Sequence, residues 1–200
     1  MASFLKSIFY LPAILICVGC VTTRYSHINM LEHNKEATTG KYVDNVWINN
    51  SQPVIDKKAK ILLEEINIDS ISDENGITKE ECKKELKKDI LTNEFNRGII
   101  TENGIEPNYK MKLIFTNMSP GDAASRVWAA ELGFGHANVE IQAIISNQNQ
   151  RIIEIKDSRN NSGAIGFRDT FGDASPQLVK EIIKQISDNI IQELNAIYRK

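Results

Sequence analysis

The stretch from residue 137 to residue 156, ANVEIQAIISNQNQRIIEIK, holds two alternating runs joined by a short polar connection. In the first run polar residues separate a row of apolar ones, which are Ala137, Val139, Ile141, Ala143 and Ile145. This two-residue period is typical of a strand with one buried face. The polar connection, Ser146 to Gln150, leads into a second alternating run, Arg151 to Lys156. Together these features predict a β-hairpin.

Two further segments before the hairpin have the character of strands. Apolar residues at Tyr109, Met111, Leu113 and Phe115 alternate with Lys110 and Lys112, which predicts a strand with one solvated face. Residues 59–68 predict the first strand of the domain. The apolar phase slips between Leu63 and Ile66, so either a bulge or a helical turn is compatible with this segment.

Two helices are predicted from capping residues and apolar stripes. Thr78 and Glu81 have the spacing of a capping box, and a helix is expected from about Thr78 to Asn96, ended by Arg97-Gly98. Ser175-Pro176 is a favoured start for a second helix. One face of that helix carries the apolar stripe Leu178, Ile182, Ile186, Ile190, Leu194 and Ile197.

The predicted order of elements is strand, helix, three strands, helix. We therefore expect an α+β fold, a two-layer sandwich with a mainly antiparallel sheet and a long C-terminal amphipathic helix. The length suits one domain with a core of its own, and residues 56–200 are predicted to form it.

The first twenty residues, MASFLKSIFYLPAILICVGC, predict the cellular location of the protein. Lys6 precedes an apolar run, and Val18-Gly19-Cys20 resembles a bacterial lipobox, so residues 1–19 are expected to be a signal peptide and Cys20 the acylated first residue. A membrane-spanning helix is the alternative, but the run is shorter than the ~20 residues needed and contains Pro12. Residue 21 is not aspartate, which favours the outer membrane, with the domain facing the periplasm.

Residues 20–55 are predicted to be a flexible tether between the lipid anchor and the domain. The segment is polar and lacks a sustained period of 2 or 3.6 residues. Val46 and Trp47 are the exception, and they mark where the chain is expected to dock first on the domain.

Charge and cysteine content exclude two kinds of interaction. Processing removes one of 24 basic residues, so the mature chain has a net charge of 23 − 26 = −3, and no attraction to nucleic acid or anionic lipid is expected. After acylation of Cys20, Cys82 has no cysteine partner for an internal disulfide. Its spacing with Leu86 and Ile90 predicts a buried position on a helix.

Catalytic, metal and cofactor signatures are absent from the sequence. The histidines, His27, His33 and His136, are scattered, and His136 near Glu131 and Asp122 is more typical of an ordinary hydrogen-bonded residue than of an acid-base centre. The Gly133-Phe-Gly135 pair lacks the third glycine of a nucleotide loop. We expect no enzyme activity, no metal site and no cofactor.

Two glycine-bearing segments, residues 119–136 and 157–174, serve no predicted strand or helix. Long connections inside a compact domain often carry function. Aromatic residues within them are the candidate partner-binding residues, Trp128, Phe134, Phe167 and Phe171. The alternative is that the phenylalanines of the second segment pin it to the sheet.

A family resemblance rests on these same parts. The chain resembles the bacterial envelope lipoproteins known as domain of unknown function 4410 in several features. These are Arg126, Gly133-Phe-Gly135 with Ala137, the VEIQAII strand, the following strand and a glycine-bearing loop before the last helix. The resemblance spans about residues 59–194. It departs from the family where Asn147-Gln148-Asn149 replaces a turn glycine and where His136 interrupts the glycine segment. It implies fold and location and transfers no catalytic residue.

The predicted location and the absence of catalytic signatures from the sequence together predict a membrane-anchored, non-catalytic interaction or assembly module. Its partner would be an unidentified envelope protein. Two alternatives stay open. One is a periplasmic binding module for a small or lipidic ligand held between sheet and terminal helix. The other is an oligomeric, secretion-associated lipoprotein, although no long apolar hairpins are left over to line a pore.

Overall fold

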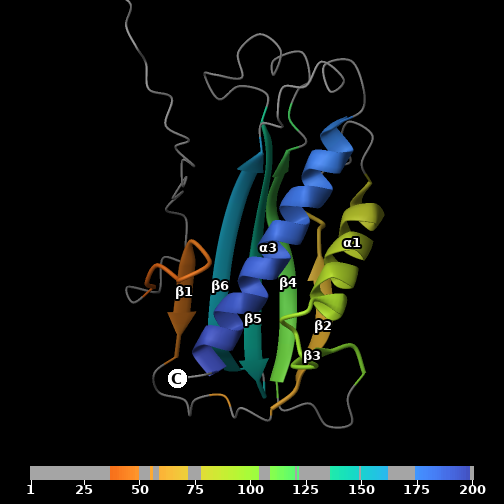
Figure 1. Ribbon diagram of the computed structural model, residues 1–200. Coiled ribbons are helices and arrows are strands. Elements are labelled where there is room, and N and C mark those ends of the chain that lie inside the picture. Colours follow the sequence, from red (N-terminus) through yellow and green to blue (C-terminus); the bar gives the residue numbers. More distant parts are fainter. Residues whose placement is uncertain are drawn as a thin grey trace, which may run out of the picture.

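The computed structural model describes residues 37–49, 55, 59–71, 78–103, 109–119, 121, 136–148, 150–161 and 174–198. These residues form one six-stranded sheet and two helices (Figure 1). In chain order the elements are β1 (Asn45–Ile48), β2 (Ile61–Asn67), α1 (Lys79–Thr92), β3 (Ile100–Thr101), β4 (Tyr109–Ser119), β5 (Ala137–Asn147), β6 (Gln150–Asn161) and α3 (Ala174–Tyr198). The strand order across the sheet is β1-β6-β5-β4-β2-β3.

The predicted hairpin is confirmed as β5 and β6. The two strands pair antiparallel from Asn147 opposite Gln150 to Ala137 opposite Asn161. Gln148 takes a left-handed backbone conformation with φ of 46° in the connection. β6 continues past the predicted end at Lys156 to Asn161, because its later residues still pair with β5 although their pattern is polar.

The expectation of a mainly antiparallel sheet is wrong, because the sheet is mixed. β1, β6, β5 and β4 pair antiparallel in that order. β2 runs parallel to both β4 and β3. The physical reason is the helix between β2 and β4: a chain that leaves one strand and crosses back through a helix enters the neighbouring strand in the same direction. The register of β2 shifts between Leu63 and Glu65, so the bulge is the correct reading of this segment.

Helix α1 begins as predicted and ends earlier. The Thr78 hydroxyl accepts from the Glu81 amide at 3.2 Å, and the Glu81 carboxylate accepts from the Thr78 amide at 3.1 Å. The helix ends at Thr92, and the Asn93 side chain accepts from the Phe95 amide, which favours a turn over another helical residue. Arg97 and Gly98, both with positive φ, lie in that turn and not at the helix end.

Helices α1 and α3 lie side by side over one face of the sheet, and the core lies beneath them (Figure 1). The whole predicted stripe of α3 is buried, from Leu178 to Ile197. It packs on inward residues of the central strands, among them Leu113, Phe115, Ile141 and Ile155, each 0% exposed. Cys82 is also 0% exposed, with its sulfur 3.5 Å from that of Met118, as its helical spacing predicted.

The segment predicted as a tether differs from the structure at its C-terminal part. Strand β1 lies within residues 20–55 and pairs with β6, so residues 37–49 belong to the folded domain. Val46 is 5% exposed and lies opposite Ile155, so β1 does dock on the domain, but docking begins before Val46 and Trp47, because Val43 is already 1% exposed.

Candidate functional site

The N-terminal described segment docks against β6 and α3. Thr38 and Val46 exchange two backbone hydrogen bonds of 2.9 and 2.8 Å, which fold residues 38–46 into a loop along the sheet edge. Gly40 is needed inside this loop, because a Cβ there would lie 2.5 Å from the Val43 Cγ2 and 3.1 Å from the Glu193 Cδ. The loop is therefore closely packed on the helix.

A polar cluster holds the loop of residues 38–46 against β6. It consists of Asp44, Asp157, Arg159 and Asn189. The Arg159 guanidinium donates to the Tyr42 carbonyl at 3.0 Å and, through Nε, to Asp157 Oδ2 at 3.1 Å. Asn189 of α3 donates to the same carboxylate oxygen at 2.9 Å. Two carboxylates thus share one guanidinium, since Asp44 Oδ1 lies 3.8 Å from Arg159 Nη1.

Burial raises the pKa of one carboxyl group in this cluster, that of Asp157. The Asp157 side chain is 0% exposed, and desolvation raises its pKa from 3.8 to about 7. The Asn189 hydrogen bond and the Arg159 charge lower this pKa, while the Asp44 carboxylate raises it further. Arg159 Nη2 lies 2.6 Å from Asp157 Oδ1, in an ion pair whose angles are not those of a hydrogen bond.

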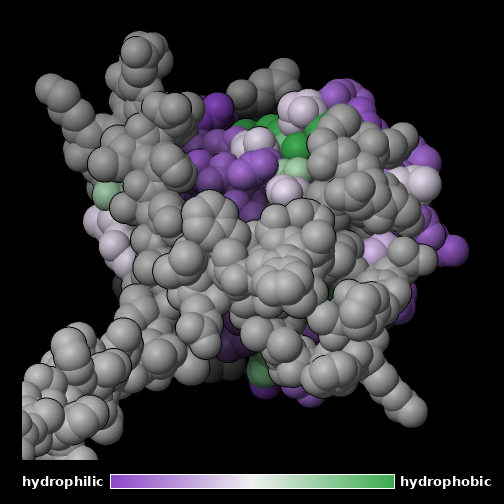
Figure 2. All heavy atoms as spheres, turned by 90° about the horizontal axis from the view of Figure 1, so that it is seen from above, coloured by the Kyte–Doolittle hydropathy of each residue, from purple (hydrophilic) through white to green (hydrophobic). Residues whose placement is uncertain are grey.

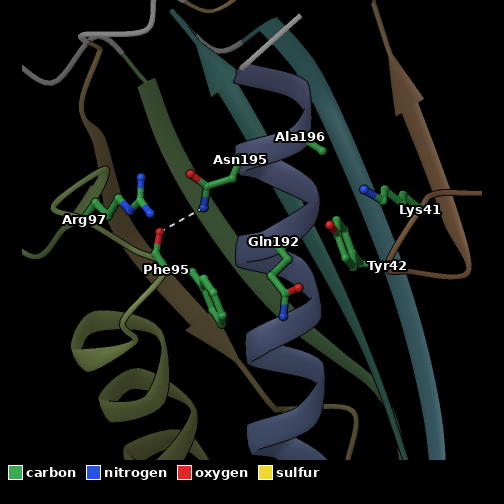
Figure 3. A pocket seen from close by; sticks show the side chains of 7 residues that line it. All are labelled: Lys41, Tyr42, Phe95, Arg97, Gln192, Asn195 and Ala196. Atoms are coloured by element: carbon green, nitrogen blue, oxygen red, sulfur yellow. Dashed lines mark hydrogen bonds between the residues drawn. The ribbon is translucent and has the colours of Figure 1, made fainter.

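The same loop forms one wall of a groove on the outer side of α3. The groove has a volume of about 260 Å³ and is lined by Lys41, Tyr42, Phe95, Arg97, Gln192, Asn195 and Ala196. Figure 3 shows Lys41 and Tyr42 on one side of the helix, Phe95 and Arg97 on the other, and the two amide side chains between them. Among the described residues that line it are two cations and two aromatic rings but no carboxylate.

Both walls of the groove are fixed to α3. The Tyr42 amide donates to Glu193 Oε2 at 2.8 Å, and Glu193 is only 6% exposed. On the other side Asn195 Nδ2 donates to the Phe95 carbonyl at 2.9 Å. Asn93 Nδ2 donates to Asp188 Oδ1 at 2.5 Å and holds the start of the same turn. The groove is therefore shaped before any ligand arrives.

The predicted site residues lie outside the described residues. This holds for the lipidation site Cys20 and for the partner-binding candidates Trp128, Phe134, Phe167 and Phe171, as it does for Glu131 and Asp122. The structure does place the residues that flank the two glycine-bearing segments. These are Ser119 and Ala137 on either side of the first, and Asn161 and Ala174 on either side of the second.

The flanking residues lie at one end of the sheet. Ser119 is opposite Asn138, and Ala137 is opposite Asn161, so β4, β5 and β6 all carry their segment ends there. Figure 2 looks onto this end, where the visible described residues are mostly hydrophilic beside a small hydrophobic patch. Three adjacent strands therefore bring the two segments to one place.

Metal-binding and membrane-spanning features were sought in the described ranges. Among these residues no group of three His, Cys, Asp or Glu side chains is placed to hold a metal ion. Neither α1 nor α3 is both long and apolar enough to cross a bilayer.

No local pattern in the sequence predicts the groove or the polar cluster. The groove joins Lys41, Arg97 and Gln192, which are more than 50 residues apart, and the polar cluster joins Asp44 to Asp157 and Asn189, so no local spacing links their members. One clue was present in the polar residues of β6: Asp157 and Arg159 hold the inward positions that apolar residues occupy earlier in the strand. An alternating pattern that turns polar on its buried face indicates a buried polar contact.

Comparisons with known proteins give distant structural similarity only. No family model matches the chain, and no curated protein matches it. A protein of Xanthomonas campestris from the family DUF330 is 12% identical, with 76% of this chain and 90% of that chain covered and a TM-score of 0.44. The PelC dodecamer of Paraburkholderia phytofirmans is 9% identical, with coverages of 72% and 95% and a TM-score of 0.40. With TM-scores below 0.5, these similarities carry no argument about function.

Proposed function

We propose that the chain is a lipid-anchored module of a bacterial cell envelope that binds a protein partner and performs no catalysis. Its anchor is an acylated Cys20 in the outer membrane, with the domain facing the periplasm. Its contact surface is formed by the parts of residues 119–136 and 157–174 that lie beyond the ends of β4 and β6, with the aromatic residues Trp128, Phe134, Phe167 and Phe171.

The observation that carries this proposal is that the described residues flanking both segments lie at one end of the sheet. Their flanking residues are cross-strand neighbours, as in the pair Ala137 and Asn161. Four aromatic residues in two segments that start from the same place have the composition of an interface centre, where aromatic side chains are enriched.

The docking of residues 38–46 supports the role of the preceding segment as a tether. Sixteen residues lie between Cys20 and Ala37, and the seventeen steps from one Cα to the next reach at most about 60 Å at ~3.5 Å per residue. The chain joins the sheet beside Ile155, which is six residues along β6 from Asn161, or about 20 Å. The point of attachment and the proposed contact end are thus separate places on the domain.

The test is crosslinking in intact cells followed by pull-down of the full chain from envelopes. A Cys20→Ala chain serves as the unanchored control, and Phe134→Ser with Phe171→Ser as the contact variant. Ile48→Ser is the control, because Ile48 is an exposed hydrophobic residue at 39% and lies outside both segments and the groove. We expect a defined partner that is lost with Cys20→Ala and with the double variant and is kept with Ile48→Ser.

Two results would contradict the proposal. If the folded double variant recovers the partner as well as the parent does, the two segments are not the contact surface. Recovery of the chain alone would favour self-association, which native mass spectrometry of the detergent-solubilised chain then measures as a defined oligomer.

A further inference from the structure

The groove over the C-terminal turns of α3 has the chemistry of an anion site. Its lining joins the Lys41 ammonium and the Arg97 guanidinium, one from each wall. Within the described residues neither cation takes part in a salt bridge, whereas Lys110, Lys112 and Arg159 each have a carboxylate partner. Two positive charges thus line one cavity whose described lining residues include no acidic side chain.

The remaining lining residues suit an organic body attached to the anion. The Phe95 ring is 37% exposed, and the Tyr42 ring lies 4.9 Å below the Lys41 ammonium. Gln192 makes no hydrogen bond to another described residue, so its amide can donate to a ligand. Asn195 is already engaged, since its amide nitrogen donates to the Phe95 and Ile191 carbonyls.

The backbone at Arg97 gives independent support. Arg97 has φ of 45°, in the left-handed region where glycine or asparagine is preferred, and Gly98 follows with φ of 70°. An arginine there costs conformational energy that a glycine would not. Nothing in the described contacts of the turn requires the guanidinium for folding, because Asn96 holds the turn through its bonds to the Leu91 carbonyl and to Ile100.

We propose that this groove binds a phosphate monoester, with Lys41 and Arg97 holding the phosphoryl oxygens from opposite walls, Gln192 donating a hydrogen bond, and the rings of Phe95 and Tyr42 contacting the organic group. A phosphate monoester carries between one and two negative charges near neutral pH, which matches the two cations. The volume of about 260 Å³ is small for a ligand pocket and admits one such group. The proposal holds whether or not the chain has a lipid anchor.

The alternative role of the two cations is structural. Positive side chains near the end of a helix interact favourably with its exposed carbonyls. If that were their purpose, removing them would lower stability and leave no ligand affinity to lose. Arg97→Gly separates the two roles, because it removes the guanidinium and at the same time relieves the left-handed backbone.

The experiment titrates phenyl phosphate into the full chain in nonionic detergent and follows the amide chemical shifts of Gln192 and Ala196. A second titration uses mixed micelles that contain phosphatidic acid, whose headgroup is also a phosphate monoester. The variants are Arg97→Gly and Lys41→Gln, and the matched control is Lys84→Gln, an exposed lysine of α1 outside the groove.

We expect the groove amides to shift with at least one of the two probes, and the dissociation constant to rise about tenfold or more in each groove variant. Lys84→Gln should stay within about twofold of the parent. Binding of phenyl phosphate identifies a free ligand, whereas binding of the micelle alone identifies a lipid headgroup. The proposal is overturned if neither probe shifts the groove amides, or if Arg97→Gly folds and binds as the parent does.

Discussion

Replacing Asp157 with asparagine should change how the stability of the domain depends on pH. Asp157 is fully buried and has a pKa of about 7, against 3.8 for an ordinary aspartate, so the difference is about three units. One unit corresponds to about 1.4 kcal/mol. The free energy of unfolding linked to this proton is therefore about 4 kcal/mol.

The sign follows from the raised pKa. Between about pH 4 and pH 7 the folded chain keeps a proton on Asp157 that the unfolded chain has lost, so unfolding releases a proton. The stabilising contribution is complete below the unfolded pKa and is lost as the pH rises through the folded pKa. Asparagine has nearly the same shape, keeps the Asn189 and Arg159 neighbours, and cannot titrate. The stability of the variant minus that of the parent should rise by about 4 kcal/mol from about pH 4 to pH 8.

The assay is urea unfolding of both chains at several pH values in this range, followed by far-ultraviolet circular dichroism. Taking the difference in stability between the two chains cancels the titration of groups common to both. Asp44 and Arg159 are direct neighbours of residue 157 and are present in both chains. Asp69→Asn, at an exposed position, measures the general effect of losing one carboxylate. A difference that is flat with pH, or that falls, would refute the reasoning, because it would mean that the Arg159 ion pair outweighs burial.

Three further substitutions test the packing around the site and the core. Gly40→Ala should destabilise the domain by about 1–3 kcal/mol in urea unfolding, since its Cβ would lie 2.5 Å from the Val43 Cγ2. Thr78→Ala should cost about 1 kcal/mol, because it removes the hydroxyl that caps α1, and hydrogen exchange should speed up in the first turn. Leu86→Ala should cost about 2–5 kcal/mol at its fully buried position and lower the melting temperature accordingly. The exposed Thr39→Ala, the hydroxyl-preserving Thr78→Ser and the exposed Lys84→Ala are the respective controls; equal loss in a variant and its control would contradict that prediction.

Local periodicity was sufficient to predict most of the central elements. The β5–β6 hairpin and the buried stripe of α3 each repeat one pattern over many residues, so burial on one face leaves a clear trace in the sequence. The capping box at Thr78 was equally readable, because both of its hydrogen bonds lie within four residues.

Features that depend on distant pairing were missed or misjudged. β1 has four residues and β3 has two, too few to show a period, and each is held by a partner far along the chain. The parallel pairing of β2 with β4 depends on the route of the chain through α1, which alternation alone does not encode. The polar cluster joins Asp44, Arg159 and Asn189 across more than 100 residues, so only the fold brings it together.

The Asp44 carboxylate and β1 together cover the outer edge of β6 and so affect how the domain resists aggregation. β1 covers only four residues of the twelve-residue β6, and beyond it Asp44 Oδ2 accepts from the Ser158 amide at 2.9 Å in place of a backbone carbonyl. A chain clipped between β1 and Ile55 could lose this cover while keeping its core. Its longest strand would then offer a row of unpaired amides and carbonyls to the same strand of another molecule. Loss of β1 by proteolysis would thus expose the edge of β6 to strand-by-strand aggregation, and intact β1 protects the domain against it.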